Sequence, residues 1–165
     1  MLQSASIGPR RWRSLRRFSL FVVLLLISWP VWVNAHGYKL SDITITHPWA
    51  TPTHGSVDGK GYLALRNKGH KSDQLLSATT EVAARVELYS ANQDHGVLKT
   101  HSVNALEIPA GKTVRLEPGK SHLMLIGLKK PLQDGQHFSL VLQFQHAGTI
   151  TVDMFVQLNA DESIY

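Results

Sequence analysis

The amino-acid sequence predicts an all-β sandwich of about nine short strands, and three observations support this class. No stretch shows the sustained 3.6-residue apolar period of an amphipathic helix. Short runs of alternating apolar and polar residues recur instead, and Gly, Pro, Asn or Asp interrupts them. The interruptions fall roughly every 8–12 residues, which is the usual spacing of strands and turns in β-sandwiches. The chain of 165 residues has room for one ordinary domain.

These interruptions divide the chain into its strands and turns. The first strand is expected at 40–46, and the Gly-containing stretch 51–61 that follows it is typical of a loop. A hairpin loop is predicted at 91–96, and a polar tail at 159–165. Turns are predicted at 67–69, 109–111, 117–120, 134–135 and 146–148. The later strands are expected at 62–66, 74–79, 85–90, 97–103, 106–108, 113–116, 122–128, 138–144 and 149–156.

Residues 1–35 are predicted to be a secretory signal peptide. Residues 1–17 contain five arginines, residues 18–33 are almost wholly apolar, and small residues precede a cut after Ala35. An uncleaved anchor is the alternative, but an apolar run of 16 residues interrupted by Pro30 is short, since a span needs about 20. We therefore expect a mature domain at 36–165 in the periplasm, with no membrane insertion after cleavage.

Composition excludes several classes of function. The sequence contains no cysteine, which excludes disulfides, thiolate metal sites and cysteine nucleophiles. Five of the 17 basic residues precede residue 36, which leaves twelve basic residues against twelve acidic ones. We therefore expect no nucleic-acid partner, since such a partner requires a basic face. No nucleophile elbow, phosphate-binding loop or zinc-protease helix motif is present, and we expect the protein not to be an enzyme.

His122 and Met124 are the candidate metal ligands. Residues i and i+2 of a strand point to the same face, so the imidazole and the thioether would lie side by side. Leu123 and Leu125 would then enter the core. A neutral imidazole with a thioether suits Cu(I) and is a poor donor set for Mg²⁺ or Ca²⁺. On these residues alone, the alternative is an exposed histidine beside a methionine that fills a gap in the packing.

The other histidines offer a second, weaker possibility. After cleavage, the amine and ring nitrogen of His36 could chelate Cu(II), with His47 or His54 completing the site. The alternative is an incidental histidine on a flexible terminus. Most remaining histidines stand in loop-like sequence and are expected at the solvated surface, namely His54, His70, His95, His137 and His146.

Five stretches of the mature chain occur in the order found in one known family. They are 38–50 (YKLSDITITHPWA), 61–67 (GYLALRN), 84–88 (ARVEL), 108–119 (IPAGKTVRLEPG) and 121–132 (SHLMLIGLKKPL). Over nearly all of its mature length, the chain resembles the periplasmic copper chaperone family of the PCuAC type. The resemblance implies a cupredoxin-like, Greek-key β-sandwich that binds Cu(I) and carries it toward cytochrome c oxidase. The implied partner is a copper-accepting protein, such as a subunit of that oxidase or a Sco-type protein.

Only half of the family's ligand pattern is present. That pattern reads His, ten residues, Met, twenty-one residues, then His-x-Met, and its last pair falls on His122 and Met124. The first two positions hold Tyr89 and Thr100, whose oxygens are hard, weak donors for Cu(I). The neighbouring His101 should face the opposite side of its strand. Three alternatives stay open: a copper carrier with a reduced or rebuilt site, a Cu(II) protein using His36, and a metal-free interaction module.

Overall fold

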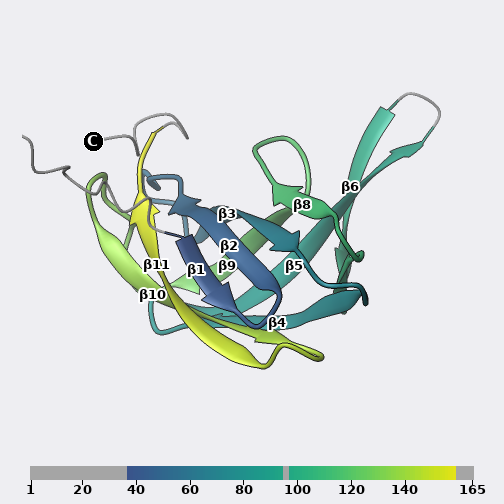
Figure 1. Ribbon diagram of the computed structural model, residues 1–165. Coiled ribbons are helices and arrows are strands. Elements are labelled where there is room, and N and C mark those ends of the chain that lie inside the picture. Colours follow the sequence, from purple (N-terminus) through teal and green to yellow (C-terminus); the bar gives the residue numbers. More distant parts are fainter. Residues whose placement is uncertain (1–36, 95–96, 159–165) are drawn as a thin grey trace, which may run out of the picture. The chain divides into compact units, whose positions relative to one another are not determined.

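The computed structural model describes residues 37–94 and 97–158, and the regular structure in these residues is entirely β-strand (Figure 1). The eleven strands are β1 (Gly37–Leu40), β2 (Ile43–Ala50), β3 (Asp58–Asn67), β4 (Asp73–Thr80), β5 (Ala83–Asp94), β6 (Val97–Val103), β7 (Leu106–Ile108), β8 (Thr113–Leu116), β9 (His122–Leu128), β10 (His137–Phe144) and β11 (Thr149–Val156). The predicted all-β fold is confirmed. No helix in the described residues is long and apolar enough to cross a membrane. The predicted signal peptide, His36 and the predicted tail lie outside them.

Hydrogen bonds join the strands into one mixed sheet. Its order is β6-β5-β9-β3-β2-β11-β10-β4-β7, with β1 beside β2 and β8 beside β3. The strands β2 and β11 pair in parallel, with Trp49 opposite Phe155 and Ala50 opposite Val156. The other described pairs are antiparallel. In Figure 1 the strands β4, β10 and β11 curve beneath β1 and β2. In this strand order, β9 lies between β3 and β5, within the sheet and away from its edges.

The core is formed by alternate residues of nearly every strand. In β9, Leu123 and Leu125 are 0% and 1% exposed, so their side chains point inward as the sequence predicted. In β10 the buried residues follow the same period of two: Phe138, Leu140, Leu142 and Phe144. A fully buried leucine stabilises the fold by about 1.5–3 kcal/mol. A slip of one residue would expose every such side chain, so burial fixes the register of β9.

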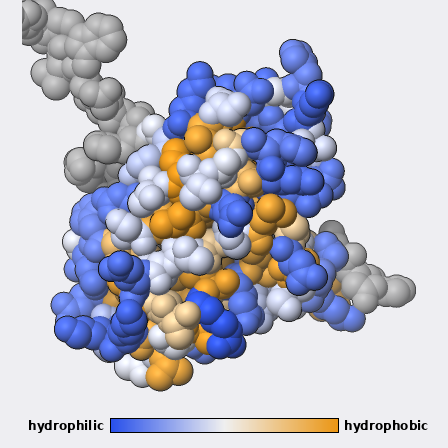
Figure 2. Space-filling view, turned by 90° about the horizontal axis from the view of Figure 1, so that it is seen from below, coloured by the Kyte–Doolittle hydropathy of each residue, from blue (hydrophilic) through white to orange (hydrophobic). Residues whose placement is uncertain are grey.

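Figure 2 shows the surface seen from below, where hydrophobic residues form a broken band flanked by hydrophilic ones. The exposed large hydrophobic residues of the described chain are Val57, Leu76, Val97, Leu98 and Leu158. They belong to the β2–β3 loop, to β4, to β6 and to the segment after β11. Such scattered exposure is ordinary for protein surfaces and does not mark a binding face.

The predicted loop at 51–61 is shorter than expected, because β3 begins at Asp58. Gly59 and Gly61 are strand residues whose backbones lie close to the core. A Cβ on Gly61 would lie 3.2 Å from Met154 Cε, and a Cβ on Gly59 would lie 3.3 Å from Leu128 Cδ1. Glycine at these positions permits close packing rather than a turn. Composition alone does not separate these two uses of glycine.

The described part of the chain forms eleven strands rather than about nine. The predicted first strand at 40–46 is divided by a turn at Ser41 and Asp42, where the φ angle of Ser41 is 52°. This left-handed conformation is uncommon for a residue other than glycine, and the apolar pattern gives no sign of it. The strand β5 also continues through residue 94, so most of the hairpin loop predicted at 91–96 is strand. Residues 95–96 lie outside the described residues.

Asp73, the first residue of β4, is a buried carboxylate held by backbone donors. Its oxygens accept hydrogen bonds from the N–H groups of Gln74, His146 and Ala147 at 2.8, 2.9 and 2.9 Å. Burial alone would raise the pKa of Asp73, but these hydrogen bonds outweigh it and hold the pKa below its usual value of 3.8. A lowered folded-state pKa stabilises the fold above the unfolded-state pKa. This stability is lost as the pH falls through the folded-state pKa.

We expect Asp73→Asn to lower the free energy of unfolding by about 1–3 kcal/mol at neutral pH, because an amide has a single acceptor oxygen and leaves a buried N–H unpaired. Urea unfolding at a series of pH values measures this. The wild type should lose stability as the pH falls below about 4, and the variant should lose less over that range. Asp134→Asn, in an exposed turn, is the control and should behave as wild type. Equal pH slopes for wild type and Asp73→Asn would contradict this account.

Candidate metal centre

His122 and Met124 lie on one face of β9. They alternate with the core residues Leu123 and Leu125, so both side chains point to the outer side of the sheet. Across the strand pairs, His122 is opposite Tyr89 and Met124 is opposite Glu87 and Lys60. His122 is 6% exposed, whereas Met124 is half-buried. His122 is thus not the exposed surface histidine that the packing alternative assumed.

The surroundings of His122 define which ring nitrogen carries the proton. Its Nδ1 lies 2.7 Å from the backbone carbonyl oxygen of Lys120. Because a carbonyl oxygen only accepts hydrogen bonds, Nδ1 carries the proton and donates it. In the neutral ring, Nε2 then has no proton and presents a free lone pair. This Nε2 atom is buried and has no hydrogen-bond partner.

A buried, unpartnered Nε2 is the state in which a histidine can accept a metal. Buried polar atoms nearly always have a partner, so this nitrogen is free to accept one from outside the protein, either a water molecule or a metal ion. Histidines that bind metals commonly donate their other ring N–H to a backbone carbonyl, which fixes the ring and its tautomer. The residues present therefore fit a soft metal ion at Nε2, with the thioether of Met124 on the same face.

Tyr89 of β5 lies directly against the His122 ring. The two ring centroids are 5.2 Å apart and the ring planes differ by 15°, which is a stacked arrangement. On its other side, β5 pairs with β6, so that Tyr89 is opposite Ser102 and Ala91 is opposite Thr100. Tyr89 and Thr100 hence face the same side of the sheet as His122. His101 is opposite Ser90, and it faces the other side as predicted.

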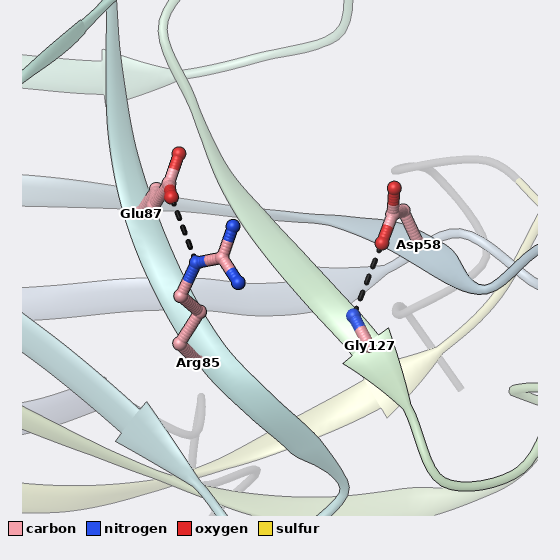
Figure 3. A network of polar contacts seen from close by, with 4 residues as sticks. All are labelled: Asp58, Arg85, Glu87 and Gly127. Carbon is pink, nitrogen blue, oxygen red and sulfur yellow. Dashed lines mark hydrogen bonds and ion pairs between the residues drawn. The ribbon is translucent and has the colours of Figure 1, made fainter.

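Charged side chains lie on the strands beside Met124, and the two carboxylates among them already accept hydrogen bonds. Glu87 accepts a hydrogen bond from Arg85 Nε at 2.9 Å, and Asp58 accepts one from the Gly127 N–H at 3.0 Å (Figure 3). Lys60 adds a positive charge on the opposite neighbour strand. Both signs of charge are present. The carboxylates are hard donors and do not extend a Cu(I) ligand set.

A buried aromatic pair, one residue on β2 and one on β3, lies on the same face of the sheet as Lys60. Tyr62 follows Lys60 by two residues, and its ring centroid lies 4.6 Å from that of Trp49, with the planes tilted by 38°. Both residues are buried, and burial raises the pKa of the Tyr62 hydroxyl from 10.0. Tyr62 is therefore neutral at physiological pH and contributes an apolar surface rather than a charged ligand.

The other described histidines do not gather at this centre. His47, His54, His70, His101, His137 and His146 are exposed. His137 begins β10 rather than lying in a loop, and its Nδ1 is 2.8 Å from Asp153 Oδ2. Within residues 37–94 and 97–158, no group of three or more His, Cys, Asp or Glu side chains is arranged to hold a metal ion. His95 and the alternative site at His36 lie outside these ranges.

Two contributors to the centre have no clear sequence signal. The Lys120 carbonyl is a backbone group, so residue identity at position 120 does not reveal it. Tyr89 stands in the sequence as the replacement of an expected ligand, and nothing in the pattern shows that its ring stacks on His122. The pairing of β5 with β9, together with the alternation within each strand, would have brought positions 89 and 122 together.

Comparison with known proteins gives one family. Residues 43–156 match the LpqE-like family, described as "Putative lipoprotein LpqE-like". The curated protein "Putative lipoprotein Lxx21020" of Leifsonia xyli subsp. xyli (strain CTCB07) is 28% identical over 146 residues, which cover 85% of this chain and 87% of that protein.

Two solved structures share the fold and part of the sequence. The copper-bound PCuAC domain from PmoF2 is 25% identical, covers 75% of this chain and 99% of its own, and has a TM-score of 0.65. The solution structure of Cu(I)-DR1885 from Deinococcus radiodurans is 27% identical, covers 77% of this chain and 84% of its own, and has a TM-score of 0.59. The predicted PCuAC resemblance and the cupredoxin-like fold are confirmed. This chain therefore belongs to the LpqE-like family and has the fold of PCuAC copper-binding domains.

Proposed function

We propose that this protein is an extracytoplasmic copper chaperone that holds Cu(I) through His122 Nε2 and Met124 sulfur. The observation that carries the proposal is the buried Nε2 atom, which has no partner while Nδ1 donates to a backbone carbonyl. Copper is present in the similar PmoF2 domain and in DR1885. The lipoprotein names of the family and of its Leifsonia relative, together with the predicted signal peptide, support a location outside the cytoplasm.

The donor set favours copper transport over copper-dependent catalysis. An imidazole and a thioether match Cu(I), and copper here is cargo rather than a resident cofactor. Tyr89 and Thr100 stand where the PCuAC pattern has a histidine and a methionine. The ion is therefore held less tightly than in a site with all four ligands. A weakly held ion is readily passed to an acceptor. We propose a copper-accepting protein of cytochrome c oxidase assembly, either an oxidase subunit or a Sco-type protein, and this destination rests on the PCuAC resemblance.

A competitive Cu(I) titration against a chromophoric chelator tests the two ligands. We expect the wild type to bind one Cu(I), and the double variant His122→Ala/Met124→Ala to bind at least about a hundredfold more weakly, since loss of even an indirect contact to a ligand costs about 10–100-fold. His101→Ala is the control, because His101 faces the opposite side of the sheet, and it should bind as wild type. Wild-type binding no stronger than that of the double variant would favour the metal-free alternative.

Restoring the two replaced positions should strengthen binding. We expect Tyr89→His/Thr100→Met to raise the Cu(I) affinity by at least about tenfold, because both positions face the same side as His122 and supply soft ligands. The matched control is Ser90→His/His101→Met, which adds the same residue types on the opposite face. The same titration measures both. An equal rise in Cu(I) affinity in the two double variants would mean that the face of the sheet carrying the new ligands does not matter. This result would contradict the proposed position of the site.

A further inference from the structure

We propose that Tyr89 is a positioning residue for copper binding, which holds the His122 imidazole through the face of its ring and not through its hydroxyl group. The inference rests on the proposed function, because it concerns the same ion. It assigns a role to the residue that stands where the PCuAC ligand pattern has a histidine.

Two contacts act on the His122 ring in complementary directions. The hydrogen bond from Nδ1 to the Lys120 carbonyl lies at one edge of the ring, and at 2.7 Å it directs that edge toward the turn that precedes β9. It leaves the ring able to tilt about the line of the bond. The Tyr89 ring, at 5.2 Å and 15°, lies against one face of the imidazole and restricts this tilt. Together the two contacts fix the direction of the Nε2 lone pair.

Tyr89 stands on a strand that is paired on both sides. Its strand β5 pairs with β6 on one side and with β9 on the other, so residue 89 is opposite both Ser102 and His122. Two residues after Tyr89, the Ala91 N–H donates a hydrogen bond to Ser121 Oγ at 2.9 Å. This bond connects β5 to the residue before His122. A binding residue supported by such a shell keeps its geometry when the ion leaves.

The hydroxyl group of Tyr89 is not needed for this role. A neutral phenol oxygen is a hard, weak donor for Cu(I), whereas the ring face is what contacts the imidazole. Removing the hydroxyl alone should therefore weaken copper binding if Tyr89 is a ligand, and should leave it unchanged if Tyr89 acts through its ring. Phenylalanine keeps the ring, and leucine keeps an apolar side chain without a ring.

We would titrate Cu(I) into wild type, Tyr89→Phe and Tyr89→Leu against the same chelator. Tyr89→Phe should bind within about twofold of wild type, and Tyr89→Leu should bind about five- to tenfold more weakly, since a stacked aromatic pair contributes up to about a tenfold factor. Loss of binding in Tyr89→Phe equal to that in Tyr89→Leu would make the hydroxyl a ligand and overturn the proposal. Unchanged binding in Tyr89→Leu would overturn it as well.

Long-range ¹H–¹⁵N NMR of the copper-free proteins reports the tautomer and the ring-nitrogen signals of His122. These would not change if Tyr89 only stabilised the fold. Wild type and Tyr89→Phe should show His122 as a single tautomer protonated at Nδ1, and Tyr89→Leu should show mixed tautomers or shifted ring nitrogens with its backbone amide spectrum otherwise retained. Identical ring-nitrogen signals in all three would overturn the positioning role. If the wild type binds no Cu(I), the proposed function fails, while the NMR comparison still decides whether Tyr89 holds the ring.

Discussion

The hydrogen bond from His122 Nδ1 to the Lys120 carbonyl determines what the rest of the site can do. It places the proton on one ring nitrogen and leaves Nε2 buried with a free lone pair. Without it, the ring could turn or change tautomer, and the Nε2 lone pair would no longer be presented. Because the acceptor belongs to the backbone two residues away, this arrangement requires the chain to turn immediately before β9. The turn that begins with Glu117-Pro-Gly provides it, and the Glu117 N–H donates to the Ser121 carbonyl at 2.9 Å.

The two faces of β9 serve different purposes. Inward, Leu123 and Leu125 fix the register by burial; outward, the same register places His122 opposite Tyr89 and Met124 between Glu87 and Lys60. The register that core packing fixes thus also positions the two proposed metal ligands. His122 is buried, whereas Met124 is half-buried and Thr100 on β6 is exposed. A site with one fixed, hidden donor and one accessible side is suited to an ion that must enter and leave.

Much of the fold could be predicted from the sequence, because strands in a curved sheet keep the period of two and turns use Gly, Pro, Asn and Asp. The boundaries of β6 to β9 follow directly from this pattern. The split between β1 and β2 could not be predicted, since it depends on the backbone conformation of Ser41. The strand positions of Gly59 and Gly61 could not be predicted either, because their close approach to Leu128 and Met154 is a contact between distant parts of the sequence. At the site, alternation predicted the shared face of His122 and Met124. The orphaned Nε2 and the stacked Tyr89 depend on contacts between separate strands and therefore required the structure.

X-ray absorption at the copper K-edge of the Cu(I)-loaded protein would show whether His122 and Met124 bind the ion, because it reports the atoms bound to copper. We expect one sulfur scatterer from Met124, the outer-shell signature of one imidazole from His122, and a low coordination number, with the sulfur lost in Met124→Leu. A first shell of nitrogen and oxygen atoms alone would contradict it, since copper would then be held elsewhere in the chain.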